Sequence, residues 1–237
     1  MARGRGKLRV GLISSLSHYR IDDAPKENSI IPFKDDLEIV EEAARDLKGR
    51  GIDITYVMTV GKNNKVGNRL SGYGNVECQS MVPIRTYPNM IADLDLDLVV
   101  VPLQHNDFND SKSNIKVLEC AALGIPVLVS DSFAYRGFID EKYMFRDGIE
   151  LAAKIVWVRS WDEKTYLKTI TDNYNSFFGG KSMYYGNQLD TYWLEKNLPL
   201  VGDTFLKYED EMKSEDGIVA PMLKQQEVNE NGKKENN

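Results

Sequence analysis

Short apolar segments rich in β-branched residues alternate with amphipathic helical patterns along most of this chain. The apolar segments are predicted to be strands, at 8–14, 52–60, 76–82, 96–101 and 125–130. Apolar residues at helical spacing predict helices at 35–50, 87–94, 113–123, 161–174 and 187–196. The Gly- and Asn-rich segment 62–75 is predicted to be a loop. Because strands and helices that alternate in this way build parallel sheets, we expect an α/β fold: a single Rossmann-like, doubly wound parallel sheet with helices on both faces.

The composition allows a hydrophobic core without covalent crosslinks. The 237 residues are 42% hydrophobic and 28% charged, which is typical of a globular protein. The two cysteines, Cys78 and Cys120, are too few for a disulfide framework or a zinc site. A net charge of −6, from 30 basic and 36 acidic residues, disfavours general nucleic-acid binding, which requires an excess of basic charge.

The ends of the sequence predict location and domain organisation. The basic start, residues 1–9, is not followed by the apolar core of a signal peptide, and no apolar run approaches the length of a membrane span. We therefore expect a cytoplasmic protein. From residue 207 onward acidic residues outnumber basic ones, and the last ten residues are almost all polar or glycine. This composition predicts a Rossmann-like domain over 1–206 and an acidic, disordered tail over 207–237.

The segment after the predicted strand 96–101 carries the densest group of polar residues. Ligands of open parallel sheets bind at the carboxyl ends of strands, so this loop and the following helix are a candidate site. On a helix over 113–123, Lys112, Lys116 and Glu119 would share one narrow stripe. The rest of that helix is predicted to be mostly buried: Ile115, Val117, Leu118, Ala121 and Ala122.

The start of this helix suits a phosphate, because free backbone N–H groups and the helix dipole favour an anion. The polar residues around the predicted N-cap are Ser111, Ser113 and Asn114, and Lys112 adds a full positive charge. Glu119 could accept two hydrogen bonds from a diol such as a ribose. The competing interpretation is an ordinary amphipathic helix with a Lys–Glu pair on its surface.

Three sequence segments carry a resemblance to a known family. They are residues 93–103, 108–119 and 124–130, which read DLDLDLVVVPL, FNDSKSNIKVLE and GIPVLVS. Together they resemble the donor-binding, C-terminal half of retaining GT-B glycosyltransferases of the "group 1" type, whose pattern is D-x-x-x-x-P-L, F-N-x-x-K-S-x-x-K-x-x-E and G-x-P-V-x-x-S. A looser likeness extends over about residues 8–193. The resemblance implies one half of a GT-B fold that binds a nucleoside-diphosphate sugar for retaining, metal-independent hexosyl transfer.

The resemblance also implies roles for individual residues. Glu119 resembles the glutamate that binds the ribose hydroxyls, and Lys112, Ser113 and Asn114 resemble the loop beneath the pyrophosphate and sugar. Segment 84–87 resembles the loop that borders the base. The predicted catalytic residues are Lys112 and His105, and the predicted nucleotide-sugar-binding residues are Tyr87, Asn109, Ser111, Ser113, Asn114, Lys116, Glu119, His18 and Arg20.

Other signals compete with surface or structural alternatives. Asp93, Asp95 and Asp97 form two overlapping D-x-D patterns of the kind that hold a divalent ion in metal-dependent sugar transferases. They precede their strand and would lie at its amino end, so we expect no metal and no cofactor other than the nucleotide-sugar substrate. His18 and His105 follow predicted strands on the ligand side and could bind sugar or phosphate, although surface histidines are more common. A cation in the first long loop, such as Arg20, could neutralise a pyrophosphate, or the loop could simply be solvated.

Two departures from the family pattern keep other functions open. Ser111 stands where many relatives carry a second glutamate that touches the donor sugar. Complete enzymes of this type have two Rossmann-like domains, and the acceptor-binding half is expected to be absent here. The alternatives are a non-catalytic, GT-B-derived structural or assembly protein, and a subunit that pairs with a separate acceptor chain or with another copy of itself.

Overall fold

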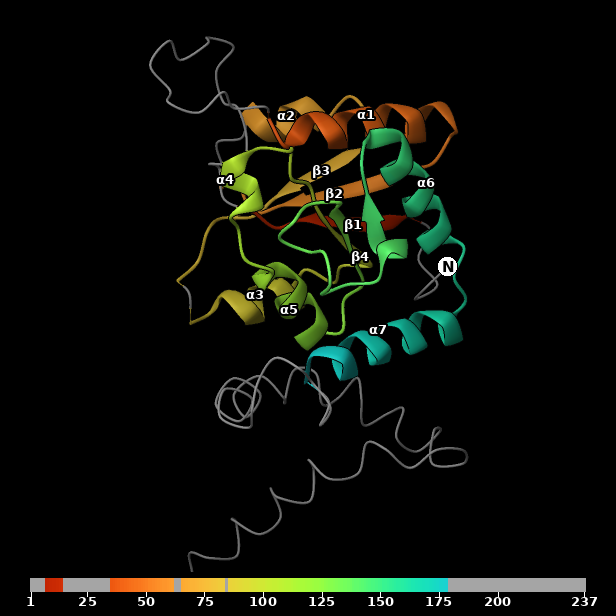
Figure 1. The fold of residues 1–237 in the computed structure, drawn as a ribbon. Coiled ribbons are helices and arrows are strands. Elements are labelled where there is room, and N and C mark those ends of the chain that lie inside the picture. Colours follow the sequence, from red (N-terminus) through yellow and green to blue (C-terminus); the bar gives the residue numbers. More distant parts are fainter. Residues whose placement is uncertain (1–6, 15–34, 62–64, 84, 179–237) are drawn as a thin grey trace, which may run out of the picture.

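Six parallel strands form the centre of the molecule in a computed structural model that describes residues 7–14, 35–61, 65–83 and 85–178 (Figure 1). The strand order is β3-β2-β1-β4-β5-β6, and every neighbouring pair is parallel. The strands are β1 Leu8–Leu12, β2 Ile54–Met58, β3 Asn75–Cys78, β4 Leu98–Val101, β5 Val127–Ser130 and β6 Met144–Phe145. This is the predicted Rossmann-like, doubly wound sheet, and the predicted fold class is confirmed.

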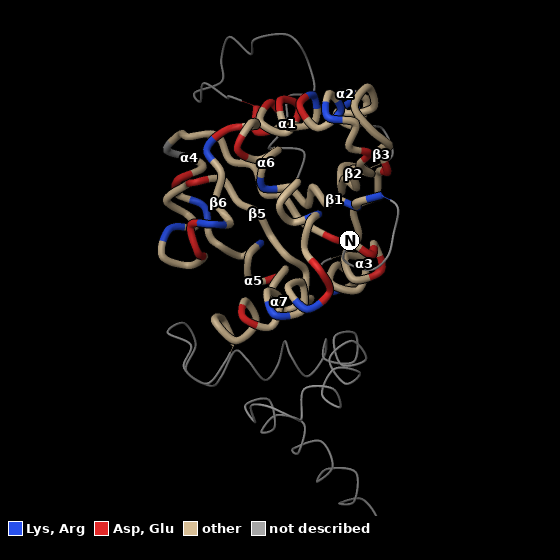
Figure 2. Tube along the Cα trace, turned by 90° about the vertical axis from the view of Figure 1, so that its right-hand side faces the viewer, with Lys and Arg blue, Asp and Glu red and all other residues tan. Residues whose placement is uncertain are grey.

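Helices cover both faces of the sheet, with α1, α2 and α6 on one face and α3, α5 and α7 on the other (Figure 1). Their bounds are α1 Leu37–Gly49, α2 Lys65–Leu70, α3 Tyr87–Asp93, α4 Asp107–Asp110, α5 Ile115–Ala122, α6 Gly148–Arg159 and α7 Glu163–Phe178, with a 3-10 turn, η3, at Glu141–Tyr143. Figure 2 shows basic and acidic residues interspersed along α1 and α7. Within the described ranges, no helix is both long enough and apolar enough to cross a bilayer.

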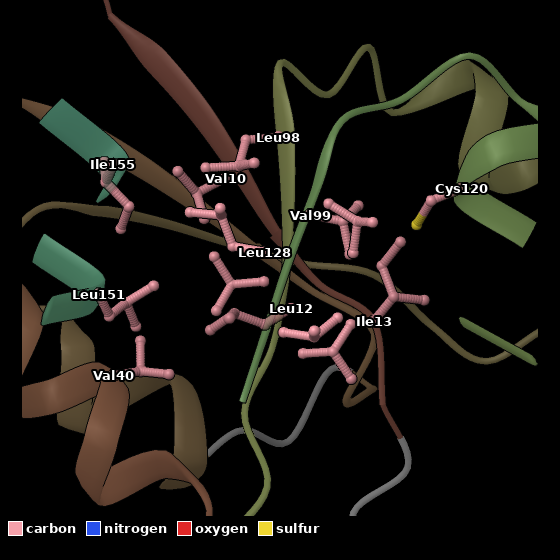
Figure 3. Packing of buried hydrophobic residues seen from close by; sticks show 14 of the residues in the cluster. Val10, Leu12, Ile13, Val40, Leu98, Val99, Cys120, Leu128, Leu151 and Ile155 are labelled. Carbon is pink, nitrogen blue, oxygen red and sulfur yellow. The ribbon is translucent and has the colours of Figure 1, made fainter. Parts of the chain in front are cut away.

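The core consists of apolar side chains from both faces of the sheet. Parallel strands are buried on both sides by crossover helices, so β2, β4 and β5 are buried at every residue. In Figure 3, Leu128 points toward Val40 of α1 and Leu151 of α6, whereas Val99 points toward Cys120 of α5. Because successive residues of a strand point to opposite faces of the sheet, each strand contributes to the core on both faces.

Three helices and one strand of the structure are absent from the sequence prediction: α2, α4, α6 and β6. The segment 62–75, predicted to be a loop, contains α2, because Val66 and Leu70 are buried in the core despite the Gly- and Asn-rich composition. Helix α6 was not predicted. Its apolar residues Ile149 and Trp157 are exposed while others are buried, so its apolar pattern has no clear period. Three sequence predictions, the helix at 187–196, the domain boundary after 206 and the tail at 207–237, lie outside the described residues.

A bidentate ion pair connects β1 to β3 across β2, near the amino ends of the strands. Arg9 Nη1 lies 2.8 Å from Glu77 Oε1 and Arg9 Nη2 lies 2.9 Å from Glu77 Oε2, although β1 and β3 are not neighbours. Arg9 Nη2 also donates to the carbonyl oxygen of Leu94 at 3.1 Å. The hydrogen bonds from Arg9 hold the pKa of Glu77 below its usual value, although partial burial opposes this.

We expect Glu77→Gln to lower the free energy of unfolding by about 1 kcal/mol at neutral pH, since the pair is only partly exposed and bidentate. A carboxyl with a lowered folded-state pKa stabilises the protein above its unfolded pKa, about 4.3, and this contribution is lost as the pH falls through that value and below it. Urea unfolding at several pH values should therefore show wild type and variant converging in acid. The exposed Glu141→Gln is the control, and a difference that persists at acid pH would contradict the ion-pair account.

Candidate functional site

A pocket of about 360 Å³ lies at the carboxyl ends of the strands, where the strand order reverses between β1 and β4. Such reversal points are where open α/β sheets bind their ligands. Its walls come from loops that follow different strands and from the start of α5. The lining residues are Ser14, Thr59, Met81, Val82, Tyr87, Met90, Val101, Leu103, Lys112, Ser113, Ile115, Lys116 and Tyr135.

The start of α5 lies two residues later than predicted. The helix begins at Ile115, so Lys112 and Ser113 lie in the preceding turn rather than on the helical stripe, which is a correction to the sequence prediction. Lys112 and Ser113 nevertheless line the pocket together with Lys116. Ile115, predicted to be buried, is 53% exposed and lines this pocket.

Asn114 is the N-cap of α5, but its side chain makes no capping hydrogen bond. Its amide nitrogen is buried and has no hydrogen-bond partner within the part of the chain that the structure describes. A buried donor without an acceptor costs about 1–3 kcal/mol. The end of the helix that was predicted to bind phosphate therefore carries an unused donor.

Lys116, Tyr87 and Glu119 form a cluster where α3 meets α5. Lys116 Nζ lies 2.8 Å from Glu119 Oε2 and donates to Tyr87 Oη at 2.7 Å, and it also lies 4.8 Å from the centre of the Tyr87 ring. Burial raises the pKa of Tyr87 to about 12, and the charge of Glu119 adds to this. Burial works to lower the pKa of Lys116, but Glu119 raises it above its usual value. Lys116 and Glu119 thus belong to a partly buried, charged cluster and do not form the solvated surface pair of the competing interpretation.

Lys112 is half-buried at the pocket wall. Burial lowers the pKa of its ammonium group, and the Asp36 carboxylate partly opposes this. Its backbone N–H donates to the carbonyl oxygen of Asn109 at 3.1 Å. Asn109, predicted to bind the donor, is itself buried and is not among the residues that line the pocket. Its side-chain amide donates to Asp36 Oδ1 at 3.0 Å and to the carbonyl oxygen of Gln104 at 2.8 Å.

Four further predicted residues, Asn114, Glu119, His105 and Ser111, are not among those that line the pocket. His105 and Ser111 are exposed. His105 helps to keep the pKa of Asp131 below its usual value, after the larger effect of the hydrogen bond from Arg136. His18 and Arg20 lie outside the described residues.

The D-x-D aspartates lie away from the pocket, at the opposite edge of the sheet. The backbone N–H of Arg9, near the start of β1, donates to Asp97 Oδ2 at 2.9 Å, and Asp97 directly precedes β4. The position expected for these aspartates, at the amino end of the strand, is therefore correct. Among the described residues, no three metal-ligating side chains come close enough together to hold an ion.

Several pocket residues were not identified from the sequence. Thr59, Met81, Leu103 and Tyr135 each follow the end of a strand and line the pocket, together with Met90 of α3. Their side chains carry no distinctive catalytic chemistry. The available signal was their position after a strand, since the carboxyl ends of parallel strands meet at one edge.

Comparisons with known proteins identify the fold. No protein-family model and no curated protein sequence matches the chain. The catalytic domain of cholesterol-α-glucosyltransferase from Helicobacter pylori superposes with a TM-score of 0.50 at 16% identity, over 71% of this chain and 96% of that one. The O-GlcNAc transferase from Thermobaculum terrenum superposes with a TM-score of 0.52 at 15% identity, over 87% of this chain but only 38% of that one. Both neighbours are GT-B glycosyltransferases, and this chain has the fold of one Rossmann-like half of a GT-B glycosyltransferase.

Proposed function

We propose that this domain binds the nucleoside diphosphate of a sugar donor in the pocket at the carboxyl ends of β1 and β4. The observation that carries the proposal is the meeting of Lys112, Ser113 and the first turn of α5 at that pocket. A lysine charge and helix N–H groups are suited to a diphosphate. In glycosyl transfer the same groups would stabilise the negative charge that develops on the departing nucleoside diphosphate. We propose that the site works without a metal, because Lys112 and the N–H groups of the helix start supply positive charge and hydrogen-bond donors.

The rest of the pocket is suited to a nucleoside. Glu119 does not line the pocket itself, but its carboxylate contacts Lys116 and Tyr87, which do, and it can accept hydrogen bonds from ribose hydroxyls. Met81, Val82 and Met90 supply an apolar wall that would cover a flat base. The two structural neighbours are named as a glucosyltransferase and an O-GlcNAc transferase, which supports a hexose as the transferred sugar. Retention of configuration is proposed from the sequence resemblance.

A thermal-shift screen tests this proposal. The purified chain is heated with UDP, GDP, ADP, CDP or dTDP, with their sugar conjugates, and with each nucleoside lacking phosphates as the control. A ligand at about 100 times its dissociation constant stabilises by about 2.7 kcal/mol, which raises Tm by several degrees. We expect one base to raise Tm as the diphosphate and much less as the nucleoside. A well-folded sample that responds to none of the diphosphates would contradict the proposal.

A second candidate is a donor-binding subunit that requires another chain to supply the acceptor site. Large apolar side chains are exposed on the carboxyl side of the sheet: Met81, Ile115 and Phe133. Under this candidate, the purified chain binds a nucleotide sugar but neither transfers nor hydrolyses it. Turnover by the purified chain alone would exclude this alternative.

A further inference from the structure

A buried carboxylate, Asp36, lies behind Lys112, and the donor site as described gives it no role. The residue is only 1% exposed and occupies the N-cap of α1, yet its side chain does not cap that helix. Its Oδ1 instead accepts hydrogen bonds from the backbone N–H of Gln104, at 2.6 Å, and from Asn109 Nδ2, at 3.0 Å. A buried charge is costly unless it is hydrogen-bonded, so these contacts hold Asp36 against the loop that follows β4.

Asn109 connects Asp36 to the backbone of Lys112. Asn109 joins Asp36 through its side chain and accepts from the backbone N–H of Lys112, at 3.1 Å, through its carbonyl oxygen. Its side-chain amide also donates to the carbonyl oxygen of Gln104 at 2.8 Å. The turn that carries Lys112 is thus fixed to the start of α1 by a continuous set of hydrogen bonds.

Asp36 also acts on the pocket through its charge. Burial lowers the pKa of Lys112, and the negative charge of Asp36 acts in the opposite direction. Tyr135, which lines the pocket, has a pKa raised by burial and further by Asp36. The hydrogen bonds from Gln104 and Asn109 place the carboxylate beside the loop that leads to Lys112.

We propose that Asp36 is a positioning residue of the donor site, which holds the 109–112 turn in place and keeps Lys112 charged toward the diphosphate. The inference rests on the proposed function, because it concerns the same pocket. Asp36 does not touch the ligand in this account. It acts through Asn109, which sets the position of Lys112, and through its charge, which stabilises the ammonium form of a half-buried lysine.

The pH dependence of ligand binding distinguishes the effect of the Asp36 charge from its effect on the position of the 109–112 turn. The other titratable or charged groups that line the pocket with Lys112 are Lys116, Tyr87 and Tyr135. Lys116 is paired with Glu119 and its pKa is raised, the pKa of Tyr87 is about 12, and that of Tyr135 is raised by burial. Between about pH 7 and about pH 10, Lys112 is therefore the group whose charge responds to the loss of Asp36.

The experiment compares Asp36→Asn with wild type, using the diphosphate that gives the largest thermal shift. Asparagine keeps an oxygen that accepts from Gln104 and Asn109, so the variant removes mainly the charge. The dissociation constants are measured from about pH 7 to about pH 10, and the titration of the ligand cancels in the ratio of variant to wild type. We expect this ratio to rise several-fold with pH, because the ammonium group of Lys112 loses its proton more readily without the Asp36 carboxylate.

The decisive comparison repeats Asp36→Asn in a protein that carries Lys112→Arg, because arginine stays charged throughout this pH range. There, Asp36→Asn should give a ratio that does not change with pH. The exposed Asp172→Asn is the matched control and should leave binding unchanged. A ratio that is flat with pH in the Lys112 background, or one that rises equally in the Lys112→Arg background, would overturn the proposal.

A second variant keeps the test valid if Asp36→Asn does not fold. Asn109→Ala leaves the charge of Asp36 in place and removes its link to the turn, so we expect weaker binding with a ratio that is constant with pH. Unchanged affinity in this variant would overturn the positioning role. If wild type binds none of the five diphosphates, the proposed function itself fails; if wild type binds and both variants match it, only the inference about Asp36 fails.

Discussion

Lys112→Ala is expected to weaken binding of the nucleoside diphosphate by about 10- to 100-fold. The ammonium group lies at the pocket wall beside the start of α5, where the diphosphate is proposed to sit. Hydrogen bonds that involve a charged group contribute about 1.5–3 kcal/mol, and every 1.4 kcal/mol corresponds to a factor of ten in affinity. The dissociation constants of variant and wild type, measured by titration calorimetry at one ionic strength, give the effect directly.

Lys168→Ala is the matched control for this substitution. Lys168 is exposed on α7 and pairs with Asp172 at 3.0 Å, and it is not part of the pocket lining. Its loss should leave the affinity unchanged while altering the net charge by the same amount. Equal weakening by both variants would show that the binding reflects general electrostatic attraction and not a built site.

Phe145→Ala is expected to lower the free energy of unfolding by about 3–5 kcal/mol. Phe145 lies on β6 and is 0% exposed, and its carbonyl oxygen accepts from the backbone N–H of Asp131 at 2.7 Å. Removing a buried aromatic ring loses its transfer free energy and leaves a cavity that the surroundings fill only partly. Urea denaturation followed by circular dichroism measures this difference.

The same substitution at an exposed position provides the control. Phe133 is 73% exposed in the loop that follows β5, so Phe133→Ala should change stability by no more than about 0.5 kcal/mol. Comparable losses from both variants would contradict the assignment of β6 to the buried core.

The fold could largely be predicted because its strands are buried runs with a local signal. Segment 96–101, for example, is predicted as a strand and contains β4, all of which is buried. Helix α6 was missed for a physical reason: Ile149 and Trp157 are exposed among apolar neighbours, so hydrophobic periodicity does not mark its buried face. Helix α2 was missed because the burial of Val66 and Leu70, a tertiary effect, outweighs a composition typical of loops.

The candidate site divides in the same way. Lys112, Ser113 and Lys116 are close in sequence, so their spacing alone predicted that they lie together, whereas Glu119, predicted on the same stripe, does not line the pocket. The link between Asp36 and Asn109 spans 73 residues, and no local pattern reports a contact of that range. The polar loop residues His105 and Ser111 match the composition of a binding loop but are exposed away from the pocket lining, because composition does not fix the direction of a side chain.

The most direct test of the donor-site account is a titration that pairs a change in the protein with a change in the ligand. Wild type and Glu119→Ala are titrated with the selected nucleoside diphosphate and with its 2′,3′-dideoxy analogue, and the exposed Glu141→Ala serves as the control protein. If Glu119 binds the ribose hydroxyls, removing them weakens binding to wild type by about tenfold or more and leaves binding to Glu119→Ala almost unchanged. Equal losses in both proteins would mean that Glu119 does not touch the ribose and would contradict this placement of the nucleotide.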